Sequence, residues 1–332
     1  MDKLLIVGCG SIGRRHLTNF RAAGVGYVAG ADPNDERRRL ATGLGAARTY
    51  ASCDEALAHE SFDAAAICVP PHLHMPLSLA AAKAGCHLFI EKPLAASLDH
   101  VDALIDICAR QSLAAFVGYS YRFIPSVVKM KEMLDRGAIG RVLSARLCFS
   151  SYLPDWHPWE DYRSFYMARK EEGGGALLDE SHGLDLLRWL LGEMVVRHAT
   201  IGHISDLEIT SDDLAALVLT TGPGAVVEAH FDLLGRPPRL GLEIVGSTGT
   251  IVWDRIRHSL SVYDAGKRCW ETYPYTDADY LSMYEREVRH FISCVDAGTP
   301  PLVTVEDARK TLALALTAFD TAGAEGRMAA VP

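Results

Sequence analysis

The sequence has no apolar run of about 18 residues, the length that a transmembrane helix needs. It also has no excess of positive charge, because 33 Lys and Arg face 42 Asp and Glu, for a formal net charge of −9. That balance argues against nucleic acid or an anionic membrane as a partner. The apolar stretch from Leu4 to Val7 leads straight into glycines, without the cleavage site of a signal peptide. We therefore expect a soluble, cytoplasmic protein.

Closely spaced cysteines are missing as well. The eight cysteines are scattered, and no two of them follow a Cys-x-x-Cys pattern. Zinc sites and thioredoxin-like motifs are built on such close pairs. We interpret the cysteines as small buried side chains in a reducing compartment, and we predict no metal site.

A length of 332 residues suggests two domains at about 150 residues each. Up to residue 120, short apolar runs alternate with helix-like segments, which predicts an α/β domain with a doubly wound parallel sheet. The predicted strands there are 4–7, 27–31, 64–69, 87–90 and 114–118, and the predicted helices are 14–23, 35–44, 77–84 and 98–110.

The remainder, residues 121–332, reads as strands in succession with turn-rich connections, which predicts a large, mostly antiparallel open sheet. The strands expected are 142–150, 215–221, 225–231, 239–245, 250–253 and 259–263. Helices at 126–136, 176–191, 280–297 and 305–322 would cover one face of this sheet.

The segment Gly8-Cys9-Gly10-Ser11-Ile12-Gly13 places a G-x-G-x-x-G string between a buried strand and a helix. There, backbone N–H groups and the helix dipole face a pyrophosphate. Asp32, at the end of the second strand, would accept hydrogen bonds from the adenosine ribose and repel a 2′-phosphate. We predict NAD as the cofactor, with NADP as the alternative because Arg37, Arg38 and Arg39 follow. A glycine turn in an unrelated α/β protein is the competing interpretation.

Glu91-Lys92-Pro93 follows another predicted strand at its carboxyl end, where open α/β sheets bind ligands. Lys92 could donate a hydrogen bond to a substrate hydroxyl and stabilise the oxyanion that forms as hydride leaves. A lysine that merely pairs with Glu91 is the structural alternative.

Asp179, His182 and Asp185 lie on the predicted helix 176–191, each about 60° around the axis from the next. A neighbouring carboxylate can orient an imidazole and raise its basicity for general base catalysis. A structural histidine is the competing interpretation, and either Asp179 or Asp185 could be the supporting carboxylate.

An aromatic segment precedes this helix and contains Trp156, His157, Trp159, Tyr162 and Arg163. Aromatic rings pack on the C–H faces of sugars, while Arg and His bind hydroxyls or a carboxylate. We predict substrate binding by Trp156, His157, Tyr162 and Arg163, against the alternative that the segment only packs in an interface.

Together these motifs resemble the Gfo/Idh/MocA oxidoreductases over essentially the whole chain. The resemblance rests on the glycine string, Val69-Pro70-Pro71 with His74, Glu91-Lys92-Pro93, the segment 118–123 and the segment 173–189. It implies a Rossmann domain, a C-terminal α/β domain whose sheet forms a homodimer or homotetramer, and NAD(P)-dependent oxidation or reduction of a secondary hydroxyl of a carbohydrate.

The resemblance also implies site residues. Val69, Pro70, His74 and Glu91 would line the cofactor site, and Arg122 the substrate site. Lys92 would hold the reacting oxygen, with His182 as acid/base and Asp179 supporting it. One departure is the spacing from Asp179 to His182, which is three residues where the family usually has four, and this moves the imidazole about 100° around the helix.

Members of the family with this shorter spacing resemble oxidoreductases of bacterial surface-sugar pathways. We therefore predict a dehydrogenase or reductase acting on a sugar, sugar acid, amino sugar or nucleotide sugar. Two alternatives remain at this point. One is an enzyme that oxidises a glycoside transiently and then hydrolyses or eliminates it, and the other is a non-catalytic sugar-binding regulator on the same fold.

Overall fold

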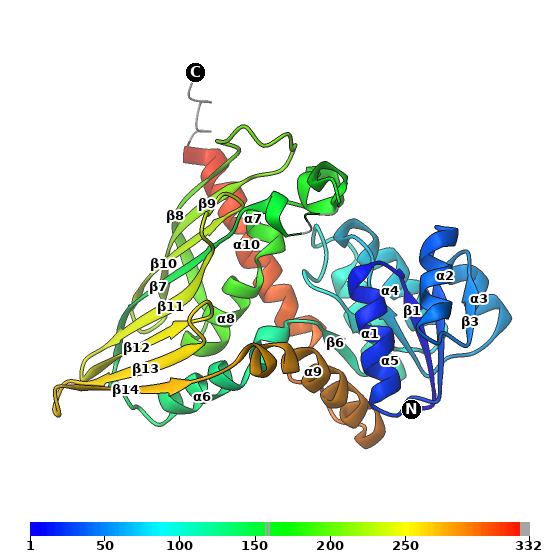
Figure 1. Ribbon diagram of the computed structural model, residues 1–332, viewed down its shortest axis with the longest axis horizontal. Helices are drawn as coiled ribbons and strands as arrows, with labels where there is room; N and C mark the ends of the chain where they lie inside the picture. The colour runs from blue at the N-terminus through cyan, green and yellow to red at the C-terminus, as the bar shows by residue number, and fades with distance from the viewer. Residues whose placement is uncertain (157, 159, 326–332) are drawn as a thin grey trace. The chain divides into compact units, whose positions relative to one another are not determined.

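The computed structural model describes residues 1–156, 158 and 160–325 and divides into two compact units (Figure 1). The first unit comprises Met1–Ser120 and Tyr284–Lys310, and the second comprises Tyr121–Met283 and the chain from Thr311 onward. The chain passes from one unit to the other within α9 (Asp277–Ala297) and again within α10 (Val305–Glu325). No helix of the described residues is long and apolar enough to cross a membrane.

The sheet of the first unit is parallel throughout and has the order β3-β2-β1-β4-β5-β6. Its strands are β1 (Lys3–Val7), β2 (Tyr27–Ala31), β3 (Arg48–Tyr50), β4 (Ala64–Ile67), β5 (His87–Ile90) and β6 (Ala115–Val117). The helices between them are α1 (Ser11–Ala22), α2 (Asp35–Gly43), α3 (Cys53–His59), α4 (His74–Lys83) and α5 (Val101–Gln111). Apart from their ends, the central strands are buried, as the unbroken apolar runs predict. The predicted parallel α/β sheet is confirmed.

The segment 284–310 also belongs to the first unit, whereas a single boundary at residue 120 would assign it to the second. Phe291 of α9 meets Phe89 of β5 edge to face, with ring centroids 5.6 Å apart. The backbone N–H of Val117 donates to the carbonyl of Val303 at 3.1 Å. These contacts join residues far apart in the sequence, so local sequence patterns do not predict them.

The second unit is built on an eight-stranded sheet with the order β14-β13-β12-β11-β7-β10-β9-β8. Its described pairings are antiparallel apart from the parallel pair β7–β10, which confirms the predicted mostly antiparallel sheet. The strands are β7 (Val142–Ser150), β8 (Met194–Gly202), β9 (Leu214–Thr221), β10 (Val226–Asp232), β11 (Arg239–Gly246), β12 (Gly249–Asp254), β13 (Ser259–Asp264) and β14 (Cys269–Pro274).

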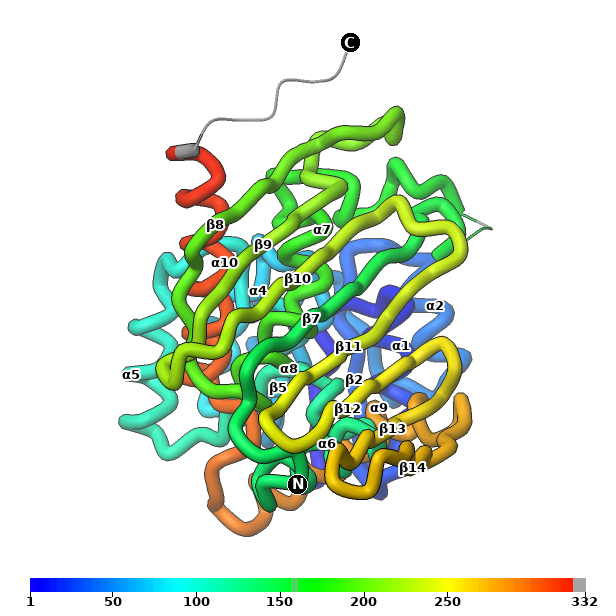
Figure 2. The backbone as a smooth tube through the Cα atoms, turned by 90° about the vertical axis from the view of Figure 1, so that its left-hand side faces the viewer, coloured from blue at the N-terminus to red at the C-terminus, as the bar shows by residue number. Residues whose placement is uncertain are grey.

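Helices α6 (Pro125–Asp135), α8 (His182–Leu191) and the later part of α10 cover one face of this sheet, and Figure 2 looks onto the other face. The strands alternate accordingly, so that in β9 Leu217 and Leu219 are buried while Val218 between them is partly exposed. The short α7 (Ala176–Asp179) lies just before α8 in the chain.

Candidate cofactor and catalytic sites

The residues predicted to bind the cofactor follow the carboxyl ends of neighbouring parallel strands in the first unit. They are Gly8 after β1, Asp32 after β2, Val69 and Pro70 after β4, and Glu91 and Lys92 after β5. Because β1 lies between β2 and β4, and β4 lies beside β5, these segments share one edge of the sheet. The strand order reverses direction at β1 and β4, and open α/β sheets bind ligands at such a point.

The glycine string forms a tight turn into α1. Gly8 has a φ of +92°, and its N–H donates to the carbonyl of Ala31 at 2.8 Å. A Cβ on Gly13 would lie 1.8 Å from the carbonyl oxygen of Gly8, whereas a Cβ on Gly10 would meet nothing within 4 Å. Gly13 is therefore required for packing, and Gly10 leaves free space in front of the N-terminus of α1.

That N-terminus is suited to an anion. Gly10 is its N-cap residue and provides no side-chain cap, and the first turn, which begins with Ser11 and Ile12, contains no acidic residue. The N–H groups of a helix start attract a phosphate through both hydrogen bonding and the helix dipole. The turn thus fits the pyrophosphate of a dinucleotide.

Asp32 fixes the glycine string from the end of β2. One carboxylate oxygen accepts the backbone N–H of Cys9 at 2.8 Å, and the other accepts that of Asn34 at 2.8 Å. Arg37, with an exposed side chain, places Nη1 3.9 Å from the Asp32 carboxylate. The position after β2 therefore combines a buried carboxylate with a solvent-facing guanidinium.

The turn that carries Lys92 is held on both sides. Glu91 Oε1 lies 2.6 Å from His16 Nε2, and Glu91 Oε2 accepts the backbone N–H of Lys92 at 3.2 Å. Burial raises the pKa of Glu91, but the hydrogen bond with His16 and the charges of His16, Lys92 and His74 together outweigh burial, so the net shift of the pKa is downward. The Lys92–Pro93 peptide is cis.

His74, at the start of α4, holds the other side of this turn. Its Nδ1 lies 2.8 Å from the carbonyl oxygen of Pro93, and its Nε2 lies 2.8 Å from that of Val69. Burial lowers the pKa of His74, and a neutral ring donates to only one of the two carbonyls. His74 thus ties the segment after β4 to the segment after β5.

In the second unit the predicted helix 176–191 is broken, which corrects the single-helix geometry expected from the sequence. α7 ends at Asp179, and α8 begins at His182 after Glu180 and Ser181. The break is a tighter turn, in which Gly183 N–H donates to the carbonyl of Glu180 three residues back at 2.9 Å. A uniform 100° step therefore does not relate Asp179 to His182.

The two carboxylates near His182 have separate partners. Asp179 accepts a short hydrogen bond from the hydroxyl of Tyr166. Asp185 is 1% exposed and receives both Nε and Nη2 of Arg122, at 2.8 and 2.5 Å. The structure thus places Arg122, predicted to contact substrate, in a buried bidentate ion pair that anchors α8.

The ring of His182 stacks on that of Tyr121, with centroids 4.4 Å apart and planes 11° from parallel. Such stacking restricts the rotation of the imidazole. Tyr121 also accepts a hydrogen bond from Tyr280 at 3.1 Å, hydroxyl to hydroxyl. The stacking on Tyr121 therefore helps to position the ring of His182.

The aromatic segment is largely engaged within the second unit. Trp156 Nε1 donates to Ser151 Oγ at 2.9 Å, and the Tyr162 hydroxyl accepts the backbone N–H of Glu208 at 3.2 Å. Arg163 pairs with Asp161 at 2.8 Å and with Glu208 at 2.7 Å and remains half exposed. His157, also predicted to bind substrate, lies outside the described residues, as does Trp159.

Three residues of these sites were not anticipated from the sequence, namely His16, Tyr121 and Tyr166. His16 follows the last glycine of the string by three residues, on the face of α1 that carries buried Gly13 and Phe20, so its spacing was a usable signal. Tyr121 stands beside Arg122 in a motif that was recognised without a role. Tyr166 is joined to Asp179 only by the tertiary fold.

Comparison with known proteins agrees with this organisation. The family model described as "Oxidoreductase family, NAD-binding Rossmann fold" matches residues 3–119, and the model "GFO/IDH/MocA C-terminal domain" matches residues 127–252. The chain is 30% identical to the myo-inositol 2-dehydrogenase of Thermotoga maritima over 329 residues, covering 94% of each chain. It is 27% identical to the NAD⁺-dependent scyllo-inositol 2-dehydrogenase of Bacillus subtilis, covering 95% of this chain and 92% of that one.

Among solved structures, a levoglucosan dehydrogenase in complex with NADH and levoglucosan shares the fold, with a TM-score of 0.87, 23% identity and 98% of each chain covered. The match of both domains and the full-length similarity to the Thermotoga maritima enzyme confirm the family recognised from the sequence motifs. The chain therefore belongs to the Gfo/Idh/MocA family of oxidoreductases and has an NAD-binding Rossmann domain.

Proposed function

We propose that this protein is an NAD-dependent dehydrogenase that oxidises a secondary hydroxyl of a sugar, sugar acid, amino sugar or nucleotide sugar, or reduces the corresponding ketone. The observation that carries the proposal is the shared sheet edge, where the open glycine turn at Gly10 and the Lys92 turn follow strands of one parallel sheet. The bound nicotinamide would supply the hydride acceptor. The named relatives act on polyols and sugars, which supports a substrate of this class.

In the oxidative direction Lys92 would donate a hydrogen bond to the reacting oxygen and stabilise the negative charge that develops as hydride leaves. His182 would accept the hydroxyl proton, with its ring oriented by Tyr121. Asp179 would support this acid/base function from its hydrogen bond with Tyr166. Asp185 is committed to Arg122, so we favour Asp179 as the supporting carboxylate.

We propose NAD as the preferred cofactor because Asp32 presents a carboxylate where the ribose hydroxyls are expected. Arg37 would let the enzyme accept NADP with lower affinity, since its guanidinium lies 3.9 Å from Asp32 and can turn towards a 2′-phosphate.

Substrate binding is proposed for Trp156, His157, Tyr162 and Arg163. The ion pairs of Arg163 with Asp161 and Glu208 are exposed to solvent, so they cost little to exchange for a sugar carboxylate. We assign Arg122 the indirect role of holding α8 and therefore His182.

We further propose a cytoplasmic homodimer or homotetramer assembled through the open face of the large sheet. A row of paired residues crosses that face, including Val195, Val226, Val245, Tyr263 and Trp270. Val195, Val226 and Trp270 are 54%, 44% and 54% exposed. Thr220, Ser144 and Thr250 lie between these apolar residues in the row. Exposed apolar side chains gathered on one face are typical of a protein interface. Light scattering of the wild type and of Val226→Glu tests this, because a charge buried in the interface at β10 should dissociate the assembly.

The test of the proposed activity has two stages. Calorimetric titration with NADH and NADPH comes first, and we expect tighter binding of NADH. A panel of polyols, sugars, uronic acids and nucleotide sugars is then screened for a change in NADH absorbance. Turnover of a panel member supports the dehydrogenase, whereas tight cofactor binding without any absorbance change would favour transient oxidation or a non-catalytic role.

A further inference from the structure

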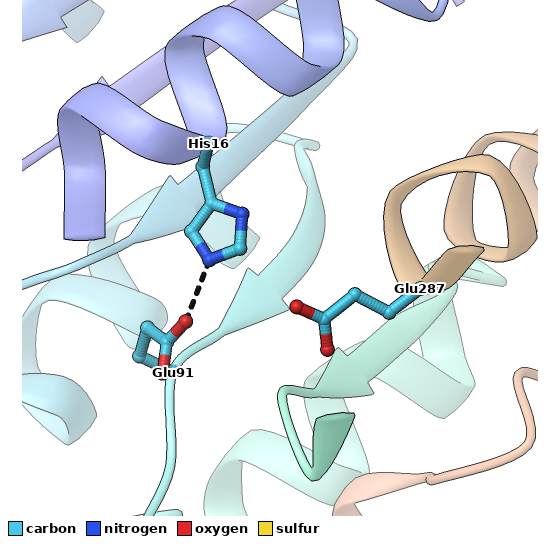
Figure 3. A group of neighbouring side chains, drawn as sticks. All are labelled: His16, Glu91 and Glu287. Carbon is cyan, nitrogen blue, oxygen red and sulfur yellow. Dashed lines mark hydrogen bonds and ion pairs between the residues drawn. The ribbon is translucent and has the colours of Figure 1, made fainter. Parts of the chain in front are cut away.

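Behind the Lys92 turn lies a group of three buried ionisable side chains, His16 of α1, Glu91 after β5 and Glu287 of α9 (Figure 3). One nitrogen or oxygen atom of each lies within 4.8 Å of the others. His16 and Glu287 are fully buried, and Glu91 is 8% exposed. All three belong to the first unit.

Glu287 stands out in this cluster. Its carboxyl group points towards His16 and Glu91 (Figure 3), yet neither of its oxygens has a hydrogen-bond partner among the described residues, and the same holds for Nδ1 of His16. A buried carboxylate without partners is very unfavourable, because burial removes its hydration and nothing replaces it. The group must therefore be neutral or bind something in the cluster.

The charges around it favour the neutral form. His16 carries at most one positive charge and is already paired with Glu91 at 2.6 Å. Arg15, on the same helix, has an exposed side chain and its guanidinium lies over the Tyr284 ring at 4.5 Å. An ionised Glu287 would thus add a second buried negative charge beside Glu91.

The shift in the pKa of Glu287 also favours its neutral form. Burial and then the charge of Glu91 raise the pKa of Glu287 well above its usual range, with Arg15 opposing them. Burial also raises the pKa of the nearby Cys68 thiol far above its usual value, so that group contributes no charge. Around Glu91, Lys92 and His74 are the further groups that act on its charge.

A metal ion fits the cluster less well. Zinc ligands bound at about 2.0 Å in a tetrahedron lie about 3.3 Å apart, whereas His16 Nε2 and Glu91 Oε1 are 2.6 Å apart, as in a hydrogen bond. A protonated Glu287 does not require His16 and Glu91 to move apart. Its distance to their nearest ligand atoms is at most 4.8 Å, and one bridging water or a small rotation of the Glu287 side chain closes that distance.

We propose that Glu287 is a neutral, proton-carrying positioning residue that donates to the His16–Glu91 pair and so holds the Lys92 turn in place. The link to Lys92 is direct, because Glu91 also accepts the backbone N–H of Lys92. The proposed hydrogen bond from Glu287 would connect α9, through Glu91, to Lys92, the residue given the oxyanion role. The catalytic part of the inference rests on the proposed function, whereas the protonation of Glu287 does not.

The protonation is tested without substrate, by the pH dependence of unfolding. Where folded Glu287 keeps its proton and the unfolded chain loses it, stability falls as pH rises. This group alone then raises the unfolding constant tenfold per pH unit, about 1.4 kcal/mol. We expect the ratio of unfolding constants, wild type to Glu287→Gln, to rise about tenfold per pH unit between pH 5 and pH 7.

The matched control is Glu285→Gln, on the same helix, where the carboxylate is exposed and pairs with Arg289. Its unfolding should follow the wild-type pH dependence. Infrared difference spectra of wild type against Glu287→Gln at pH 7 should show a carboxylic-acid C=O band. Parallel unfolding curves, or a missing band, would overturn the neutral Glu287. So would stoichiometric metal in purified protein that Glu287→Gln removes.

The positioning role is tested separately, once a substrate is known. Glu287→Met has similar size but no donor, and we expect its kcat to fall at least tenfold with the Kd for NADH within threefold of wild type. Glu287→Gln keeps a hydrogen-bond donor, so its kcat should lie much closer to wild type than that of Glu287→Met. The alkaline limb of its kcat-versus-pH profile should be shifted relative to wild type. Equal kcat values for the Met and Gln variants would refute the positioning role.

Discussion

Substituting two glycines of one turn by alanine should separate packing from cofactor binding. A Cβ on Gly13 would lie 1.8 Å from the carbonyl oxygen of Gly8, whose own N–H is bonded to Ala31. An ordinary contact requires more than 1 Å of further separation, so α1 must shift against β1. Overpacking of this kind costs about 1–3 kcal/mol, and the helix preference of Ala over Gly returns up to about 1 kcal/mol. We expect Gly13→Ala to lose about 2 kcal/mol of unfolding free energy.

Gly10→Ala should behave in the opposite way. Its Cβ meets nothing within 4 Å, and its φ of −66° and ψ of −167° suit alanine. The stability of the apoprotein should therefore change by at most about 1 kcal/mol, the scale of an N-cap effect. The added methyl group would occupy the space in front of the α1 N-terminus, and we expect the affinity for NADH to fall at least tenfold, about 1.4 kcal/mol.

Urea unfolding of the apoproteins and calorimetric titration with NADH measure both quantities on the same samples. The two variants differ by the same methyl group in the same turn, so each controls for the other. Gly10→Ala binding NADH within twofold of wild type would refute the cofactor placement. Gly13→Ala unfolding at the wild-type urea concentration would refute the packing argument.

Three further outcomes test the other residues. Lys92→Ala should lower kcat by about 10² with the Kd for NADH within threefold of wild type, because it removes transition-state stabilisation rather than cofactor contacts; activity within threefold of wild type would contradict this. His182→Ala should reduce turnover more than Asp179→Ala, and the reverse ranking in steady-state kinetics would transfer the acid/base role to Asp179. Burial raises the pKa of Asp212 to about 6, so the contribution of this group to stability declines as pH rises from about 4 to 6. The urea midpoint of Asp212→Asn should lack this decline, and midpoints that run parallel to those of wild type would contradict the raised pKa.

Much of the fold was predictable because local patterns of apolar and polar residues indicate most of its strands and helices. Unbroken apolar runs bounded by glycine or proline marked β1, β4 and β5, whose burial on both faces requires such runs. Alternation marked β9 in the second unit, where only one face is buried. The edge strands β3, β8 and β14 were missed. β3 has only three residues, and few residues of β8 and β14 are buried, so none of them shows a clear hydrophobic pattern.

The cofactor side of the candidate site was predictable for a related reason. Gly8, Asp32 and Lys92 each follow a strand directly, and parallel strands bring their carboxyl ends to one edge. The arrangement around His182 was less accessible. A periodicity argument treated 176–191 as one helix, whereas a tight turn at Glu180 separates Asp179 from His182.

Most of the order of elements, the turn into α1 and the residue types at the strand ends followed from local patterns, because these depend on backbone sterics and hydrophobic periodicity over a few residues. The partners of the ionisable groups depend instead on the tertiary fold. Arg122 meets Asp185 across 63 positions, and His16 meets Glu91 across 75. Such pairs form because a charge removed from water must find a complement wherever the fold supplies one, and sequence distance has no part in that requirement.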